Sequence, residues 1–131
     1  MSFIQRETVL LPCKLDPPHL GHAIQLHNLL KRYNVILDIY MYEGRVTTVE
    51  EVVGILADIF TKKEIGRLYV KTHQKSYSKD TSELPYDYPI FTGNEDVYKE
   101  LKIRQYKVFK MPRYSKYCST YMRKHWREND T

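Results

Sequence analysis

Two histidines three residues apart, His19 and His22, are the side chains in this sequence best placed to do chemistry. They belong to the run Asp-Pro-Pro-His-Leu-Gly-His at 16–22, which follows an apolar stretch typical of a buried strand and precedes apolar residues at helical spacing. A strand-to-helix turn suits phosphate chemistry, because the first amides of a helix are unpaired and the helix dipole adds positive charge there. Gly21 lets a ligand approach the backbone, and imidazoles can stabilise charge that develops on a phosphate oxygen. We therefore predict that this turn binds phosphate.

A hydroxyl pair and an arginine near the other end of the sequence form a second candidate site. Ser119 and Thr120 stand at the predicted start of a last helix, and Arg123 follows one turn later with Lys124 beside it. Taken alone, Ser119 is explained more simply as a helix N-cap. With Arg123 included, two hydroxyls, helix amides and a guanidinium fork make a cradle suited to a polyphosphate.

The predicted helix starts differ in charge. The helices that begin near Thr48 and Asn94 carry acidic residues in or beside their first turns, so carboxylates already neutralise their dipoles. The helices that begin at Leu20 and Ser119 carry none. These two ends are therefore the ones that we expect to attract an anion.

Strand patterns alternate with helix patterns along the whole chain. We predict strands near 8–11, 35–41, 67–70, 88–91 and 106–109, and helices near 20–32, 48–60, 94–101 and from 119. This alternation predicts one α/β domain over residues 1–131, Rossmann-like, with about five parallel strands and helices on both faces. Ligands in such sheets bind beyond the carboxyl ends of the strands, so both candidate sites should face one crevice.

Four further features of the sequence concern the packing and ends of these elements. Asp38 interrupts the second apolar run, and nothing in the sequence explains it. Residues 72–87 are rich in Lys, Ser, Asp, Tyr and Pro and are expected to form a mobile loop, either a lid over a ligand or a disordered segment. His27 lies on or near the apolar side of the first helix, where we expect packing rather than catalysis. Thr92 and Glu95 match a capping box for the helix near 94–101.

Charge and composition limit the partners. The 131 residues carry a formal net charge of +5, with basic residues crowded into the last quarter, which favours an anionic partner. No apolar stretch is long enough to cross a membrane and the first residues lack the apolar core of a signal peptide, so we expect a cytoplasmic protein. Cys13 and Cys118 stand beside the two motifs. A zinc site from these cysteines with His19 and His22 is conceivable, but the spacing does not favour it and we predict no metal held by protein ligands.

The two motifs together resemble a known family. The run at 16–22 resembles the His-x-Gly-His signature of the nucleotidylyltransferases, and Ser-Thr-Tyr-Met-Arg at 119–123 resembles their second signature, Ser-Thr-x-x-Arg. The resemblance covers nearly the whole chain. It implies an enzyme that transfers a nucleotidyl group from a nucleoside triphosphate to a small phosphorylated acceptor, with release of pyrophosphate and with Mg²⁺ bridging the triphosphate oxygens.

The resemblance also implies roles for particular residues. The histidines would stabilise charge at the α- and β-phosphates, and the second motif would hold the β- and γ-phosphates. The catalytic residues would be His19, His22 and Arg123. The nucleotide-binding residues would be Lys14, Leu15, Asp16, Gly21, Gly93, Asn94, Ser119 and Thr120.

Within the family, the C-terminal third is most similar to the archaeal type of nicotinamide mononucleotide (NMN) adenylyltransferase, with a Thr-Gly-Asn turn at 92–94 beside the adenosine. This favours adenylyl transfer from ATP to NMN, giving NAD. Arg45 stands as the replacement for an arginine that these relatives carry in the helix after the second strand. Relatives form dimers or larger rings, so a homo-oligomer is expected.

Two alternatives remain. The compact size is closer to glycerol-3-phosphate cytidylyltransferase, which uses CTP. A function of another class is a non-catalytic nucleotide- or RNA-binding module, in which the basic residues and tyrosines of the last quarter would contact nucleic acid by charge and stacking. Because both signatures are intact, nucleic acid is not the favoured partner.

Overall fold

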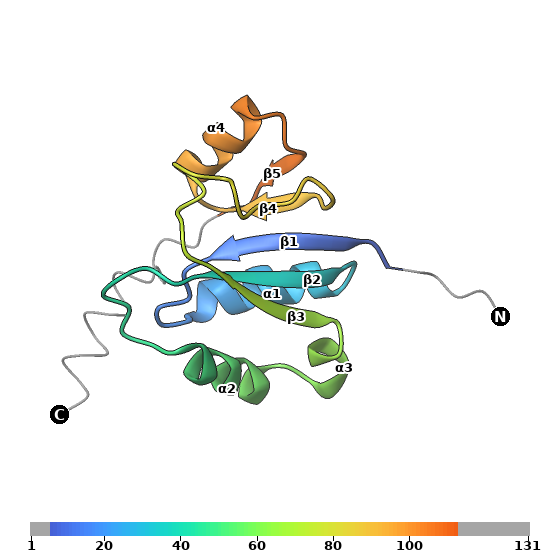
Figure 1. The fold of residues 1–131 in the computed structure, drawn as a ribbon. Coiled ribbons are helices and arrows are strands. Elements are labelled where there is room, and N and C mark those ends of the chain that lie inside the picture. The colour runs from blue at the N-terminus through green and yellow to red at the C-terminus, as the bar shows by residue number, and fades with distance from the viewer. Residues whose placement is uncertain (1–5, 113–131) are drawn as a thin grey trace.

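The structure, a computed structural model, describes residues 6–112. These residues form one parallel sheet with helices packed against it (Figure 1). Its strands are β1 (Thr8–Cys13), β2 (Asn34–Tyr40), β3 (Leu68–His73), β4 (Ile90–Thr92) and β5 (Val108–Lys110). They lie in the order β3-β2-β1-β4-β5, and each neighbouring pair is parallel. The five predicted strands and their parallel pairing are confirmed. Several strand ends differ, since β1 and β3 extend to Cys13 and His73 and both β4 and β5 begin two residues later than predicted.

The helices follow the predicted order. They are α1 (Leu20–Leu30), α2 (Val49–Ile59), α3 (Lys62–Ile65) and α4 (Glu95–Ile103). The capping box that begins α2 is formed by Thr48 with Glu51. The last helix, predicted from Ser119, lies outside the described residues. Within residues 6–112, no helix has the length and apolar character needed to cross a membrane.

Three local predictions need correction. The one-turn helix α3 was not predicted, because four residues are too few to display a helical period. The cap of α4 is Asn94, whose side chain accepts from the amides of Asp96 and Val97, whereas the Thr92 hydroxyl accepts from the amide of Asn94 itself. His27 is half exposed, and its Nδ1 lies 2.7 Å from a carboxylate oxygen of Glu64, so it links α1 to α3 instead of packing in the core.

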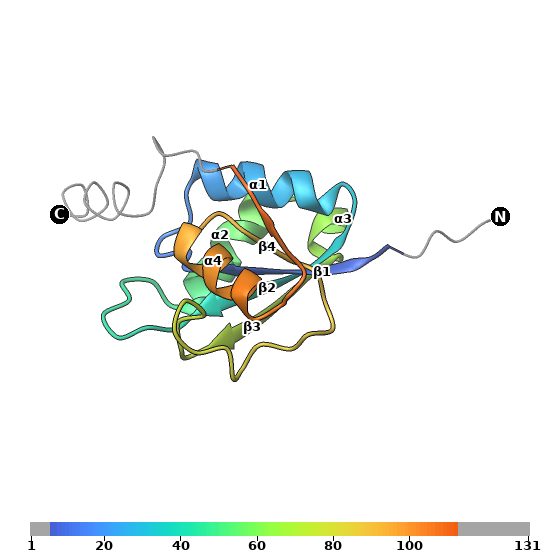
Figure 2. The ribbon, with the colours of Figure 1, turned by 90° about the horizontal axis from the view of Figure 1, so that it is seen from above.

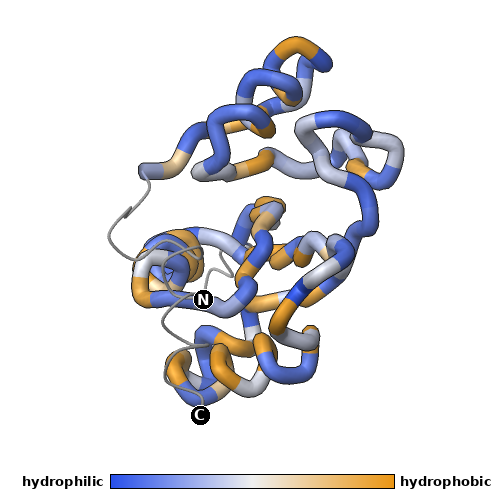
Figure 3. Tube along the Cα trace, turned by 90° about the vertical axis from the view of Figure 1, so that its left-hand side faces the viewer, coloured by the Kyte–Doolittle hydropathy of each residue, from blue (hydrophilic) through white to orange (hydrophobic). Residues whose placement is uncertain are grey.

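Apolar side chains form a core on each face of the sheet. On one face, α1 and α2 pack against the strands through residues such as Leu26, Leu30 and Val52. On the other face, α4 and the segment after β3 supply Leu101, Tyr77 and Leu84. Figure 2 shows α1 on one side of the sheet and the segment between β3 and β4 on the other. In Figure 3 hydrophobic and hydrophilic residues alternate along the helices, as expected for helices that bury one side.

The segment between β3 and β4 is a packed cover for the sheet, although it contains no helix or strand. Tyr77 and Leu84 are buried at 1% and 5% exposure, and the Tyr106 hydroxyl donates to the Leu84 carbonyl at 2.8 Å. Glu83 accepts from the backbone amides of Gln74 and Lys75. The prediction of an irregular segment is confirmed, but the mobile loop expected from its polar composition is wrong, because its few large side chains complete the core.

A buried polar cluster explains why Asp38 interrupts β2. The Asp38 carboxylate accepts from the Tyr77 hydroxyl at 2.6 Å and lies 2.8 Å from Nδ1 of His73. The His73 ring stacks on that of Tyr77, with centroids 4.0 Å apart. Burial and the hydrogen bond to Asp38 raise the pKa of Tyr77, so its hydroxyl stays protonated and donates. Asp38 therefore anchors the cover segment to the sheet.

The Tyr77→Phe variant should lose about 2 kcal/mol of unfolding free energy, because a buried carboxylate loses one of its donors. Urea unfolding followed by circular dichroism measures this loss. Tyr69→Phe is the matched control, since Tyr69 is 56% exposed on β3 and should change stability by less than about 0.5 kcal/mol. Equal midpoints for the two variants would show that the Asp38 cluster does not stabilise the fold.

Candidate active site

The turn between β1 and α1 is built around its two histidines. His19 is the N-cap of α1, and its Nδ1 accepts from the amide of His22 at 3.3 Å. His22 returns the bond, because its Nδ1 accepts from the amide of His19 at 3.2 Å. The two rings stack with centroids 3.6 Å apart and planes at 22°. Both side chains therefore lie on the same side of the first turn of α1.

This double cap fixes the tautomer of both rings. A ring nitrogen that accepts from a backbone amide carries no proton, so in the neutral imidazole the proton is on Nε2. In each neutral ring the proton is therefore on Nε2, while Nδ1 holds the helix start. The first turn of α1 contains no acidic residue, whereas α2, α3 and α4 each have one or two. Among the helices that the structure describes, the start of α1 is the one whose dipole is not offset by its own carboxylates.

Asp16 ties this turn to the loop after β2. Its Oδ1 accepts from the amides of Val46 at 2.9 Å and Thr47 at 2.8 Å, and the Tyr42 hydroxyl donates to its Oδ2. Asp16 is fully buried. Burial raises the pKa of Asp16, but the hydrogen bonds from Tyr42, Thr47 and Val46 outweigh it and hold the pKa below its usual value of 3.8. The carboxylate is therefore ionised at neutral pH and is a rigid anchor for the residues that lead to His19.

Arg45 clamps the same two loops from the other side. Its guanidinium donates to the carbonyls of Lys14 and Leu15 after β1 and of Tyr40 at the end of β2. Its Nε donates to the carbonyl of Thr47 at 3.0 Å. With the Thr47 hydroxyl, 3.1 Å from Nη2, these four carbonyls account for all five donors of the guanidinium. The predicted replacement of a relative's arginine by Arg45 is therefore not supported, and its role here is structural.

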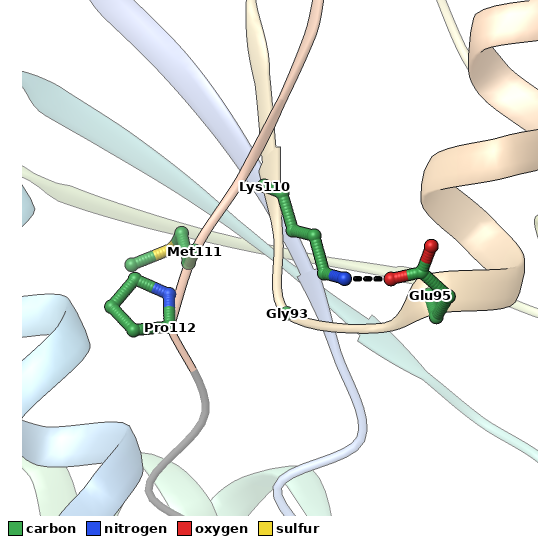
Figure 4. A pocket seen from close by; sticks show the side chains of 5 residues that line it. All are labelled: Gly93, Glu95, Lys110, Met111 and Pro112. Atoms are coloured by element: carbon green, nitrogen blue, oxygen red, sulfur yellow. Dashed lines mark ion pairs between the residues drawn. The ribbon is translucent and has the colours of Figure 1, made fainter.

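A pocket of about 460 Å³ lies at the carboxyl ends of β4 and β5 (Figure 4). It is lined by Gly93, Glu95, Lys110, Met111 and Pro112. Lys110 forms an ion pair with Glu95, the first residue of α4. The Pro112 carbonyl accepts from the Gln25 side chain of α1 at 2.6 Å, which ties the rim of the pocket to the histidine-capped helix.

The sheet order explains why these two features are neighbours. From β1 the chain moves to β2 and β3 on one side of the sheet and to β4 and β5 on the other, so the order reverses between β1 and β4. In open α/β sheets, ligands bind in the crevice at such a switch point, beyond the carboxyl ends of the strands. The loop after β1 carries the histidine turn and the loop after β4 carries Gly93 and Asn94. Both loops therefore lie at the same edge of the sheet. The prediction that the histidine turn and the motif at 119–123 face one crevice stays a prediction, because that second motif lies outside the described residues.

The other predicted residues fall into three groups. Lys14 is exposed, with its Nζ 5.5 Å from the centre of the Tyr42 ring. The side chains of Leu15 and Asp16 are buried, so their contact with a nucleotide stays a prediction. Ser119, Thr120 and Arg123 lie outside the described residues. Sequence reasoning missed the contacts of Tyr42, Thr47, Glu95 and Lys110, because each is made with another part of the chain and leaves no local signal.

Cys13 is a poor metal ligand in this setting. Burial and the nearby Asp38 carboxylate raise the pKa of its thiol, which keeps the thiol protonated, while metals bind the thiolate. Residues 6–112 hold no group of three or more His, Cys, Asp or Glu side chains that could bind a metal ion. Cys118, the other cysteine of the conceivable zinc site, is beyond these residues.

Comparison with solved structures agrees with this architecture. The chain is similar to a bifunctional NMN adenylyltransferase/ADP ribose pyrophosphatase from Francisella tularensis, complexed with AMP and a manganese ion, at TM-score 0.68 and 10% identity. It is also similar to the NadR protein in complex with NAD and AMP-PNP, at TM-score 0.61 and 18% identity. The matches cover 95% and 96% of this chain but 42% and 43% of the other two, so it spans about two fifths of their length. No protein-family model and no curated protein sequence matches the chain.

The fold class follows from the topology and these matches together. The chain forms a Rossmann-like α/β domain with a five-stranded parallel sheet, as predicted. More particularly, it has the fold shared with these two nucleotide-bound proteins. Self-association and a cytoplasmic location stay predictions.

Proposed function

We propose that this protein transfers an adenylyl group from ATP to NMN, forming NAD and releasing pyrophosphate. The observation that carries the proposal is the meeting, at one switch point, of a histidine-capped helix start without acidic residues and a pocket beside Gly93. The ligands named with the similar structures, AMP with a manganese ion and NAD with AMP-PNP, support the same substrate class.

In this proposal a phosphate oxygen of NMN attacks the α-phosphorus of ATP, and the bond from that phosphorus to the bridging oxygen breaks. Such a displacement needs alignment and neutralisation of charge more than a protein nucleophile. The Nε2–H groups of His19 and His22 donate to the α- and β-phosphate oxygens as negative charge develops. Ser119, Thr120 and Arg123 hold the β- and γ-phosphates of the leaving group.

Mg²⁺ is the proposed cofactor and would supply further charge neutralisation on the triphosphate. Because residues 6–112 offer no cluster of metal ligands, we propose that triphosphate oxygens and water hold it, which is the usual binding of Mg²⁺ to nucleotides.

Pyrophosphate release tests the proposal directly. ATP and CTP are each combined with NMN and with glycerol 3-phosphate in the presence of Mg²⁺, with the His19→Asn variant as background. We expect turnover with ATP and NMN, and NAD as the product identified by mass spectrometry. Turnover in a CTP pair alone would replace adenylyl by cytidylyl transfer. Triphosphate binding that falls steeply with salt and gives no turnover with any acceptor would instead favour the non-catalytic module.

A further inference from the structure

The two edges of the sheet differ in how open they are to another chain. Native proteins keep edge strands from pairing with other chains by making them short, charged or interrupted. β5 has three residues, whereas β3 has six and contains no proline. On β3 the side chains of Tyr69 and Val70 are 56% and 39% exposed. Its one lysine, Lys71, has its Nζ 3.7 Å from a carboxylate oxygen of Asp38, so an acid of the same sheet balances its charge. β3 is therefore the edge suited to pairing with another strand.

The backbone groups on the outer side of β3 follow from its pairing with β2. The carbonyls of Arg67 and His73 accept from amides at the two ends of β2, at 2.9 and 2.8 Å. Because peptide groups alternate in direction along a strand, the backbone groups of Leu68, Val70 and Thr72 point away from β2. Residues 6–112 contain no further strand that pairs with this side.

We propose that β3 is the interface of a homodimer, in which it pairs antiparallel with β3 of a second copy across a twofold axis at Val70. In this register Val70 exchanges both hydrogen bonds with the partner's Val70, and Leu68 exchanges both with the partner's Thr72. All outward peptide groups of the strand between these residues are then paired. On the other face of the strand, Tyr69 lies opposite the partner's Lys71, a pair that attracts through the ring face.

The helices beside β3 have charges that fit the same axis (Figure 1). An axis perpendicular to the sheet keeps like faces together and brings the amino end of β3 in one copy to the carboxyl end of β3 in the other. α3 lies just before the amino end and exposes Lys62 and Lys63. α2 begins at the carboxyl ends of the strands, where Thr47 bonds to the loop after β1, and exposes Glu50 and Glu51. The lysines of each copy are thus on the side of the glutamates of the other.

The resemblance to the nucleotidylyltransferases implied a homo-oligomer without a particular surface, and the edge of β3 supplies one. The pairing does not rest on the proposed function, because β2 separates this edge from β1, which leads to the histidine turn.

Sedimentation velocity and light scattering on the full chain test the interface, and we expect a dimer at micromolar concentration. Val70→Lys places an ammonium group from each copy at the axis and should raise the dissociation constant of the dimer at least about tenfold. Phe109→Lys is the matched control, because Phe109 is 43% exposed on the other edge strand and its replacement should leave the dimer intact. Thermal melting confirms that each variant is folded.

Cysteine cross-linking tests the register. Opposed copies of position 70 have Cα atoms about 5.5 Å apart, within disulfide range, so mild oxidation of Val70→Cys should give a covalent dimer on a non-reducing gel. Thr72→Cys should cross-link no more than the unmodified protein, because the two copies of position 72 are roughly 13 Å apart along the strands.

Three outcomes would overturn the proposal. One is a full chain that stays monomeric at these concentrations, and another is a dimer that Phe109→Lys dissociates and Val70→Lys does not. The third is a monomer in which hydrogen exchange shows a protected Val70 amide, because another segment of the same chain would then occupy the edge.

Discussion

Replacing His19 with asparagine should lower kcat for pyrophosphate release by about 10²–10³-fold and change the affinity for ATP by less than about tenfold. Asparagine is a strong N-cap, so the bond to the amide of His22 is retained. What is lost is the Nε2–H donor, and removal of one such donor from a transition state has an effect of this size. His22→Gln is the companion variant, because glutamine at the third helical position preserves the reciprocal bond to the amide of His19.

The measurements separate capping from chemistry. Steady-state kinetics give kcat, ATP titration gives the dissociation constant, and thermal melting gives stability. His19→Ala should lose about 1 kcal/mol of stability in addition to activity, because alanine cannot cap. His27→Ala removes a histidine of the same helix that pairs with Glu64 instead, and should leave kcat unchanged. If His19→Asn weakened ATP binding as much as turnover, the histidine would stabilise bound ATP and the transition state equally, and the assigned role would be wrong.

The parts of the fold that were predictable are those with a local cause. Continuous apolar runs predicted the central strands, and helical spacing predicted α2, because a strand buried on both faces and an amphipathic helix have distinct periods. The cover segment was misjudged for the same reason. Its composition is polar, and the contact that holds Tyr77 in the core is distant in sequence. Asp38, 39 positions earlier, accepts a hydrogen bond from the Tyr77 hydroxyl.

The candidate site likewise has a part that the sequence predicts and a part that it does not. The histidine turn was visible because a motif, a strand and a helix start coincide in seven residues. The supports of that turn were not visible, since Asp16 reaches Thr47 across 31 positions and Arg45 reaches Leu15 across 30. Nothing local distinguishes Thr47, which binds Asp16, from Thr48, which caps α2. Arg45 was expected from the resemblance to replace a relative's arginine, and its carbonyl partners could be known only from the fold.

Replacing Asp16 with alanine should lower the free energy of unfolding by about 3 kcal/mol, measured by urea denaturation at pH 7. The substitution leaves the half-buried amide of Val46 and the buried amide of Thr47 without an acceptor, and an unsatisfied buried donor costs about 1–3 kcal/mol. Asp16→Asn should lose less, because its carbonyl oxygen still accepts from both amides. Asp58→Ala removes an exposed carboxylate of α2 and should have an effect below about 0.5 kcal/mol.

The pH dependence distinguishes a charged anchor from a neutral one. Folding holds the pKa of Asp16 below the unfolded value of 3.8, so the unfolded chain binds the proton more tightly than the native protein. The stabilisation is therefore fully present above about pH 4 and is lost as the pH falls through the folded-state pKa. The difference in stability between the unmodified protein and Asp16→Asn should shrink over this acid range, because asparagine does not titrate. A constant difference would mean that the carboxylate charge contributes nothing, and that the turn before His19 is held by its shape and neutral hydrogen bonds alone.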